Sequence, residues 1–209
     1  MADWATISAL ATAAGTLVLA VATFSSVRAG HQAARATERA LLASIRPVLM
    51  PSRLQDEAQK VGFVDDHWIR VEGGRAAAEV SPEAIYFTFG LRNVGTGLAV
   101  LDRWDLVIDS GAAPTHRDPE SFRRLTRDLY VPGGDVGFWQ GALRDPDDPL
   151  FALARDAVDA RRRVTVDLLY GDHEGGQRTI TRFSLFPRGD DIWMTAVTRH
   201  WNLDRAAPR

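Results

Sequence analysis

Residues 4–27, WATISALATAAGTLVLAVATFSSV, contain no charged side chain, and the first charges on either side are Asp3 and Arg28. A helix needs about 20 predominantly apolar residues to cross a bilayer, and 24 are present here. No Lys or Arg precedes the stretch, which disfavours the alternative of a cleaved signal peptide. A second alternative, a helix buried in a soluble domain, is disfavoured because no charged outer face is visible. The sequence predicts a transmembrane helix in residues 1–27.

Positive charge gathers on one side of this predicted span. Arg28, Arg35, Arg39 and Arg46 follow it, whereas only the amino terminus and Asp3 precede it. An excess of Lys and Arg marks the cytoplasmic flank of a membrane helix. We therefore expect a single-pass protein of the cell membrane whose C-terminal domain lies in the cytoplasm.

Small and large side chains segregate around the predicted span when residues are placed at about 100° each. Small residues, among them Ala9, Thr16 and Ala20, line one side, and the large apolar side chains line the other. Small faces let transmembrane helices approach closely. We expect this face to allow a homo-oligomer, with general alanine richness of the sequence as the alternative explanation.

Residues 28–46 continue the helical pattern as a juxtamembrane stalk, which ends before Pro47 because proline disfavours helical geometry in the preceding residue. Beyond it, short extended runs alternate with turn residues. The expected organisation is therefore a transmembrane helix (1–27), a stalk (28–46) and a β domain (47–209).

The expected β domain is an antiparallel, immunoglobulin-like β-sandwich, because its strand-like runs are short, numerous and divided by turn signals. Phe87, Phe89 and Leu91, for example, alternate with less apolar neighbours. Two helical inserts are expected after Asp118-Pro119 and Asp148-Pro149, since Asp caps a helix and Pro suits its first position. Eight runs are predicted as strands: 48–54, 61–71, 84–93, 98–108, 129–140, 163–170, 178–186 and 192–198.

Three groups of residues are of a type that could carry chemistry or binding. The glycine-rich segment 93–97 (NVGTG) precedes another strand-like run, so we expect a tight bend and not a phosphate loop. The five tryptophans of the domain are expected mainly in the core and at its rim, with stacking on a sugar or protein as the alternative. Asp65, Asp66 and His67 form the third group together with Asp172, His173 and Glu174, and the two clusters would have to meet in space to hold a metal ion.

Charge and composition exclude several classes of protein. With 25 basic and 27 acidic residues the chain has no basic field for nucleic acid, and it has no cysteine nucleophile or Gly-x-Ser-x-Gly motif. We therefore expect no enzyme activity, no cofactor and no metal. The hypothesis is a membrane-anchored interaction or accessory module with a protein partner, and the alternative is a metal-assisted hydrolase using the Asp65–His67 and Asp172–Glu174 loops.

The order of several segments resembles that of a group of actinobacterial single-pass membrane proteins without an assigned activity. The resemblance rests on the N-terminal span and on four further segments, which are Ala43–Pro47, Leu91–Val100, Tyr170–Thr179 and Arg199–Trp201. It implies a bacterial source and an N-terminal span followed by a β-sandwich domain. It implies no mechanism and no site residues.

Overall fold

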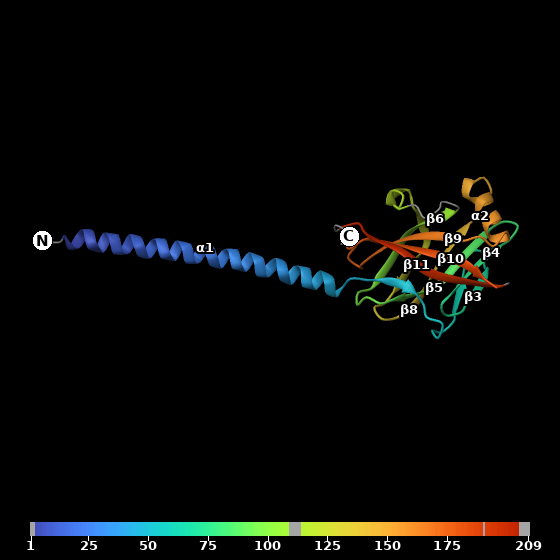
Figure 1. Ribbon diagram of the computed structural model, residues 1–209, viewed down its shortest axis with the longest axis horizontal. Coiled ribbons are helices and arrows are strands. Elements are labelled where there is room, and N and C mark those ends of the chain that lie inside the picture. The colour runs from blue at the N-terminus through green and yellow to red at the C-terminus, as the bar shows by residue number, and fades with distance from the viewer. Residues whose placement is uncertain (1–2, 109–113, 190, 205–209) are drawn as a thin grey trace. The chain divides into compact units, whose positions relative to one another are not determined.

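The computed structural model describes residues 3–108, 114–189 and 191–204, and it divides into two compact units whose boundary in the chain lies between Ser44 and Ile45. The first unit is one continuous helix, α1 (Trp4–Ser44), shown in Figure 1. Its segment Ile7–Ser44 is long and apolar enough to cross a membrane, and its most apolar stretch is wholly exposed. The predicted N-terminal apolar helix is confirmed, and it continues without a break into the expected stalk (28–46) as far as Ser44.

Several hydroxyl groups within the apolar part of α1 donate to carbonyl groups of the preceding turn of the helix. Thr12 donates to the Ser8 carbonyl at 2.9 Å, Thr16 donates to the Thr12 carbonyl at 2.9 Å, and Ser25 donates to the Val21 carbonyl at 2.8 Å. A hydroxyl left unpaired in hydrocarbon would be costly. These back-bonds lower the cost of placing the Thr12, Thr16 and Ser25 side chains in a lipid environment.

The second unit is mainly antiparallel β structure with two short helical segments (Figure 1). Every pair of strands in the described chain is antiparallel. The helical segments are η1 (Pro119–Ser121) and α2 (Pro149–Asp159). The strands are β1 (Leu49–Pro51), β2 (Gln59–Gly62), β3 (Trp68–Val71), β4 (Arg75–Val80), β5 (Ile85–Asn93), β6 (Ala99–Ile108), β7 (Arg123–Val131), β8 (Val136–Leu143), β9 (Val164–Gly171), β10 (Thr179–Arg188) and β11 (Ile192–Asn202).

Nine of these strands form one sheet in the order β1-β5-β4-β11-β10-β9-β6-β7, with β8 also paired to β5. The sheet curls into a half-barrel (Figure 1). Its end strands β7 and β8 approach each other where Arg127 donates to Gln140 at 2.9 Å. The antiparallel β domain is confirmed, but the strands join one curled sheet where two separate sheets of an immunoglobulin-like sandwich were expected. The link is made by β4, which pairs with β5 on one side and with β11 at Ala76 and Arg75 on the other.

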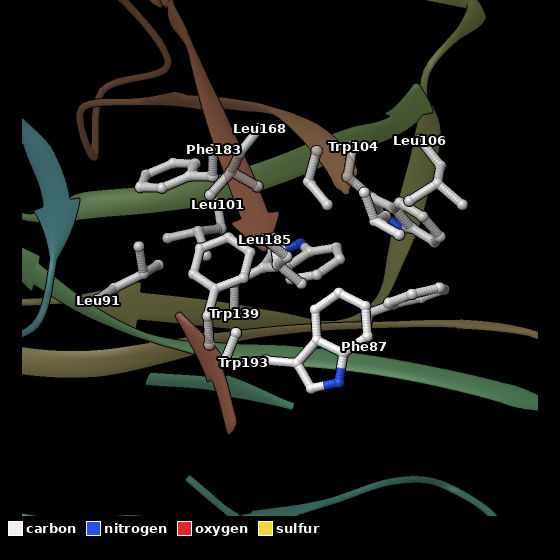
Figure 2. Close-up of a cluster of buried hydrophobic side chains, with 14 of the residues drawn as sticks. Phe87, Leu91, Leu101, Trp104, Leu106, Trp139, Leu168, Phe183, Leu185 and Trp193 are labelled. Atoms are coloured by element: carbon white, nitrogen blue, oxygen red, sulfur yellow. The ribbon is translucent and has the colours of Figure 1, made fainter. Parts of the chain in front are cut away.

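The inner face of the curled sheet holds the main core (Figure 2). Phe89 lies at its centre, with ring centroids 4.9 Å from Trp139 and 4.8 Å from Phe183. Helix α2 packs its apolar face on the same core and begins as expected, because the Asp148 carboxylate accepts a hydrogen bond from the Leu150 amide at 2.9 Å and Pro149 occupies the first turn. A smaller core lies between the β2–β3 hairpin and the outer face of the sheet, around Phe63 and Tyr86.

Two runs that were each predicted as a single strand are in fact two strands separated by a turn. The run 61–71 is divided by a turn in which Asp66 has φ of 60°, and the run 129–140 is divided by the turn between Val131 and Val136. Apolar residues flank both turns, which hides them from a reading of hydrophobicity alone. Strand β4 and the first part of β7 were missed, and the expected insert after Asp118 is a single turn, η1.

Candidate functional site

The Asp65–His67 loop forms a network of polar and aromatic contacts with its neighbours. Asp65 accepts a hydrogen bond from the Tyr86 hydroxyl at 2.7 Å and from Arg144 at 3.0 Å. Burial acts to raise the pKa of Asp65, but these two donors outweigh it and hold the pKa at about 2. His67 stacks on Tyr86 with ring centroids 4.1 Å apart, and its Nε2 lies 2.9 Å from Glu79. The loop's polar groups are therefore engaged in fastening the β2–β3 hairpin to the sheet.

The Asp172–Glu174 loop is a polar turn between β9 and β10. The buried Asp172 carboxylate accepts hydrogen bonds from the amides of Glu174 and Gly176, at 3.0 and 2.9 Å, and from the Gln177 side chain at 3.2 Å. His173 and Glu174 point to solvent. The carboxylate in this loop thus fixes the turn in the way that Asp commonly does.

The two loops lie at opposite ends of the domain. The Asp65–His67 loop contacts Tyr86, near the start of β5, whereas the chain just before Asp172 contacts its far end, because the Tyr170 hydroxyl accepts from the Leu49 amide and Leu49 pairs with Asn93. Residues 86 and 93 are separated by roughly 23 Å at 3.3 Å per residue. Among the described residues no three His, Asp or Glu side chains gather as metal ligands would.

Metal binding is directly testable on the full-length protein in detergent. An ion that binds only the folded state raises its stability by about 2.7 kcal/mol at a hundredfold excess over Kd. Because the two loops are apart, we expect no saturable melting shift with Zn²⁺, Mn²⁺, Mg²⁺ or Ca²⁺. A shift that disappears in both His67→Ala and His173→Ala would contradict this and favour the hydrolase.

The NVGTG segment forms the expected bend, and its first residue, Asn93, holds the bend in place through its side chain. The side chain of Asn93 is fully buried and makes four hydrogen bonds: its oxygen accepts from the Val48 and Gly95 amides, and its nitrogen donates to the Gly97 and Val131 carbonyls. Gly97 has no room for a side chain, since a Cβ there would overlap the Ile45 carbonyl. This bend therefore holds the first residues of the domain, 45–48, against β5 and β7.

A buried ion pair lies on the outer face of the sheet. Arg182 of β10 donates twice to Asp167 of β9, at 2.6 Å each, and both side chains are more than nine-tenths buried. Asp105 of β6 lies opposite Asp167, and burial raises its pKa although Arg117 acts to lower it. The segment 114–122 covers this group, because the Thr115 carbonyl accepts from Arg182. The burial of both side chains and their two short hydrogen bonds indicate a structural role for the pair.

The tryptophans divide as expected between core and rim. Trp104, Trp139 and Trp193 are buried, and Trp201 is partly buried. Trp68 is 57 % exposed and lies flat on Gly62, where a Cβ would fall 2.7 Å from the ring, with the Lys60 ammonium 4.7 Å from the ring centroid. Trp68 therefore belongs to the outer surface of the β2–β3 hairpin.

An arginine-lined cleft of about 180 Å³ lies where β7 and β8 fail to pair. Three of its residues are arginines, Arg123 and Arg124 of β7 and Arg144 just after β8, and Trp104 and Gln140 also line it. No sequence pattern indicates this site, because its walls come from four separate parts of the chain. The only local signal is the Arg123-Arg124 pair, which does not stand out among so many arginines.

Neither the protein-family models nor the curated proteins searched contain a match to this chain. The resemblance to actinobacterial membrane proteins therefore stays a prediction.

Proposed function

We propose that this chain is a single-pass membrane protein whose β domain acts in the cytoplasm as an interaction or accessory module. The observation that carries the proposal is α1, an apolar helix with no buried residue in its most apolar stretch. A helix that is apolar all round is expected to be covered, and a bilayer provides that cover. The arginines from Arg28 onward support the cytoplasmic placement.

The first residues of the β domain, from Ile45 on, are fixed to the rest of that domain. The first residues after α1 are fixed by the Asn93 hydrogen bonds and by the close approach of Gly97 to Ile45. Leu49, at the start of β1, donates its amide to the buried Tyr170 hydroxyl at 3.1 Å. The β domain is therefore well ordered from its first residues onward.

The topology is tested by fusing reporters to the C-terminus of the full-length chain. We expect activity only from a reporter that works in the cytoplasm, and we expect deletion of residues 1–27 to release the protein from membranes. Robust activity of a reporter that requires export would contradict the orientation. Release of the full-length protein into the soluble fraction would contradict the anchor itself.

Self-association through the small face of α1 is a second expectation. Replacing Ala9, Thr16 and Ala20 together by Leu should weaken association in a membrane two-hybrid assay, because bulky side chains keep helix backbones apart. The matched control replaces Ile7 and Val21 on the opposite face by Leu and should leave the signal unchanged. If both sets behave alike, the small face reflects composition only.

A further inference from the structure

The cleft between β7 and β8 is kept open by two features of the strands that line it. The register of β7 against β6 slips, so that Arg124 faces Arg103 while Leu129 faces Leu101, and the residues between bulge away from the ladder. On the other wall Gly141 presents no side chain. A Cβ at this glycine would lie 2.6 Å from the Trp139 ring and 3.1 Å from the Trp104 ring.

The cleft is lined by hydrogen-bond donors and by no carboxylate. Its lining includes Arg123, Arg124 and Arg144, and it contains no Asp or Glu among the described residues. Gln140 also lines it, is 3 % exposed and uses its side-chain oxygen to accept from Arg127. In the described part of the chain no hydrogen bond engages the Gln140 amide nitrogen, which leaves that donor free for a ligand.

Two of the arginines are held in place by carboxylates that lie outside the cleft. Arg123 pairs with Asp148 at 2.6 Å, and the other oxygen of Asp148 caps α2. Arg144 pairs with Asp65 at 3.0 Å. Each guanidinium carries five N–H donors in a planar fork, so one carboxylate contact leaves others available. The ion pairs therefore orient Arg123 and Arg144 without exhausting them.

Arg124 differs from the other two arginines of the cleft. Its side chain is exposed, and no hydrogen bond or ion pair to it occurs within residues 3–108, 114–189 and 191–204. The cleft thus combines two oriented cations, one cation without a counter-charge and a buried amide, and Trp104 also lines it. This combination favours a ligand that is anionic and accepts several hydrogen bonds.

We propose that this cleft binds a small oxyanion, a phosphate or carboxylate group, through Arg124, Arg123, Arg144 and Gln140. The volume of about 180 Å³ is below the roughly 300–1,000 Å³ typical of sites for drug-sized molecules. The cleft therefore holds a single anionic group and few further atoms. This inference goes beyond the anchored-module proposal and does not depend on which side of the membrane the domain faces.

The test uses the full-length protein in a neutral detergent. Inorganic phosphate and acetate are titrated separately against chloride at constant ionic strength, and the melting temperature and tryptophan fluorescence are recorded. We expect a saturable rise in melting temperature with at least one of the two anions, which identifies the preferred group. Arg124→Gln should weaken the apparent affinity at least tenfold, and Arg124→Lys should lie between it and the wild type because Lys keeps the charge but loses the fork.

The matched control is Arg188→Gln, an exposed arginine at the end of β10 away from the cleft lining. It should titrate like the wild type. Because Arg124 is exposed, Arg124→Gln should also melt like the wild type in chloride alone. The proposal is overturned if neither anion gives a saturable shift, or if Arg124→Gln and Arg188→Gln respond equally, which would show a general salt effect. A reporter result that contradicts the cytoplasmic placement would not change the interpretation of this anion titration.

Discussion

Replacing Arg182 by Ala should lower the free energy of unfolding by about 3–5 kcal/mol, the cost typical of removing one partner from a buried ion pair. Asp167 is fully buried and receives two hydrogen bonds of 2.6 Å from Arg182. Without the guanidinium its carboxylate would stay in the interior with no counter-charge in the pair, next to Asp105 on the neighbouring strand. Trp201 would also lose the cation that lies 4.9 Å from its ring centroid.

The measurement is urea denaturation of the full-length protein in detergent, followed by tryptophan fluorescence. The control is Arg188→Ala, an exposed arginine on the same strand, which should change stability by no more than about 0.5 kcal/mol. The double variant Arg182→Met with Asp167→Leu should be markedly more stable than Arg182→Ala, because it leaves no unpaired charge. If Arg182→Ala lowers the free energy of unfolding by less than about 1 kcal/mol, the buried pair does not stabilise the fold as expected.

Features encoded within a short stretch of sequence were the ones that could be predicted. The uncharged run that forms α1, the Asp148-Pro149 start of α2 and the alternation of Phe87, Phe89 and Leu91 in β5 each depend on neighbours a few residues away. These signals reflect helix capping and the two-residue period of a strand. The helix and most strands are therefore present as expected.

The pairing of strands could not be read in the same way. Residues 76 and 193 are far apart in sequence, yet their pairing joins β4 to β11 and turns the expected sandwich into one curled sheet. Alternating hydrophobicity is the same in both architectures, because each has one apolar face per strand. The order of strands is decided by long-range packing that a single sequence does not display.

The candidate sites also depend on long-range packing that a single sequence does not display. The two Asp/His loops looked like partners on the basis of residue type, and the structure places one beside Tyr86 and the other beyond Tyr170. The arginine-lined cleft, in contrast, depends on a register slip in β7 and on a glycine in β8. Neither the slip nor the closeness of Trp104 to Gly141 has a signature in sequence spacing.

Replacing Asn93 by Ala is the second change for which we expect a large effect. Its four hydrogen bonds satisfy the amides of Val48 and Gly95 and the carbonyls of Gly97 and Val131, in a fully buried position. A buried polar group left without a partner costs about 1–3 kcal/mol. We therefore expect a loss of at least about 3 kcal/mol in the free energy of unfolding, measured by the same denaturation experiment.

Asn93→Asp separates the role of the hydrogen bonds from that of side-chain volume. Asp has nearly the same shape, but when ionised it only accepts hydrogen bonds, so it would turn an oxygen toward the Gly97 and Val131 carbonyls where Asn93 donates. If the hydrogen bonds stabilise the fold, Asn93→Asp should lower the free energy of unfolding about as much as Asn93→Ala does. If only side-chain volume matters, the loss in Asn93→Asp should be small. The control is Asn202→Ala, since the Asn202 side-chain oxygen has no hydrogen-bond partner in the described chain. Asn202→Ala should lower the free energy of unfolding only slightly, because it breaks no hydrogen bond to that oxygen. An equal loss in Asn93→Ala and Asn202→Ala would contradict the stabilising role proposed for the Asn93 hydrogen bonds.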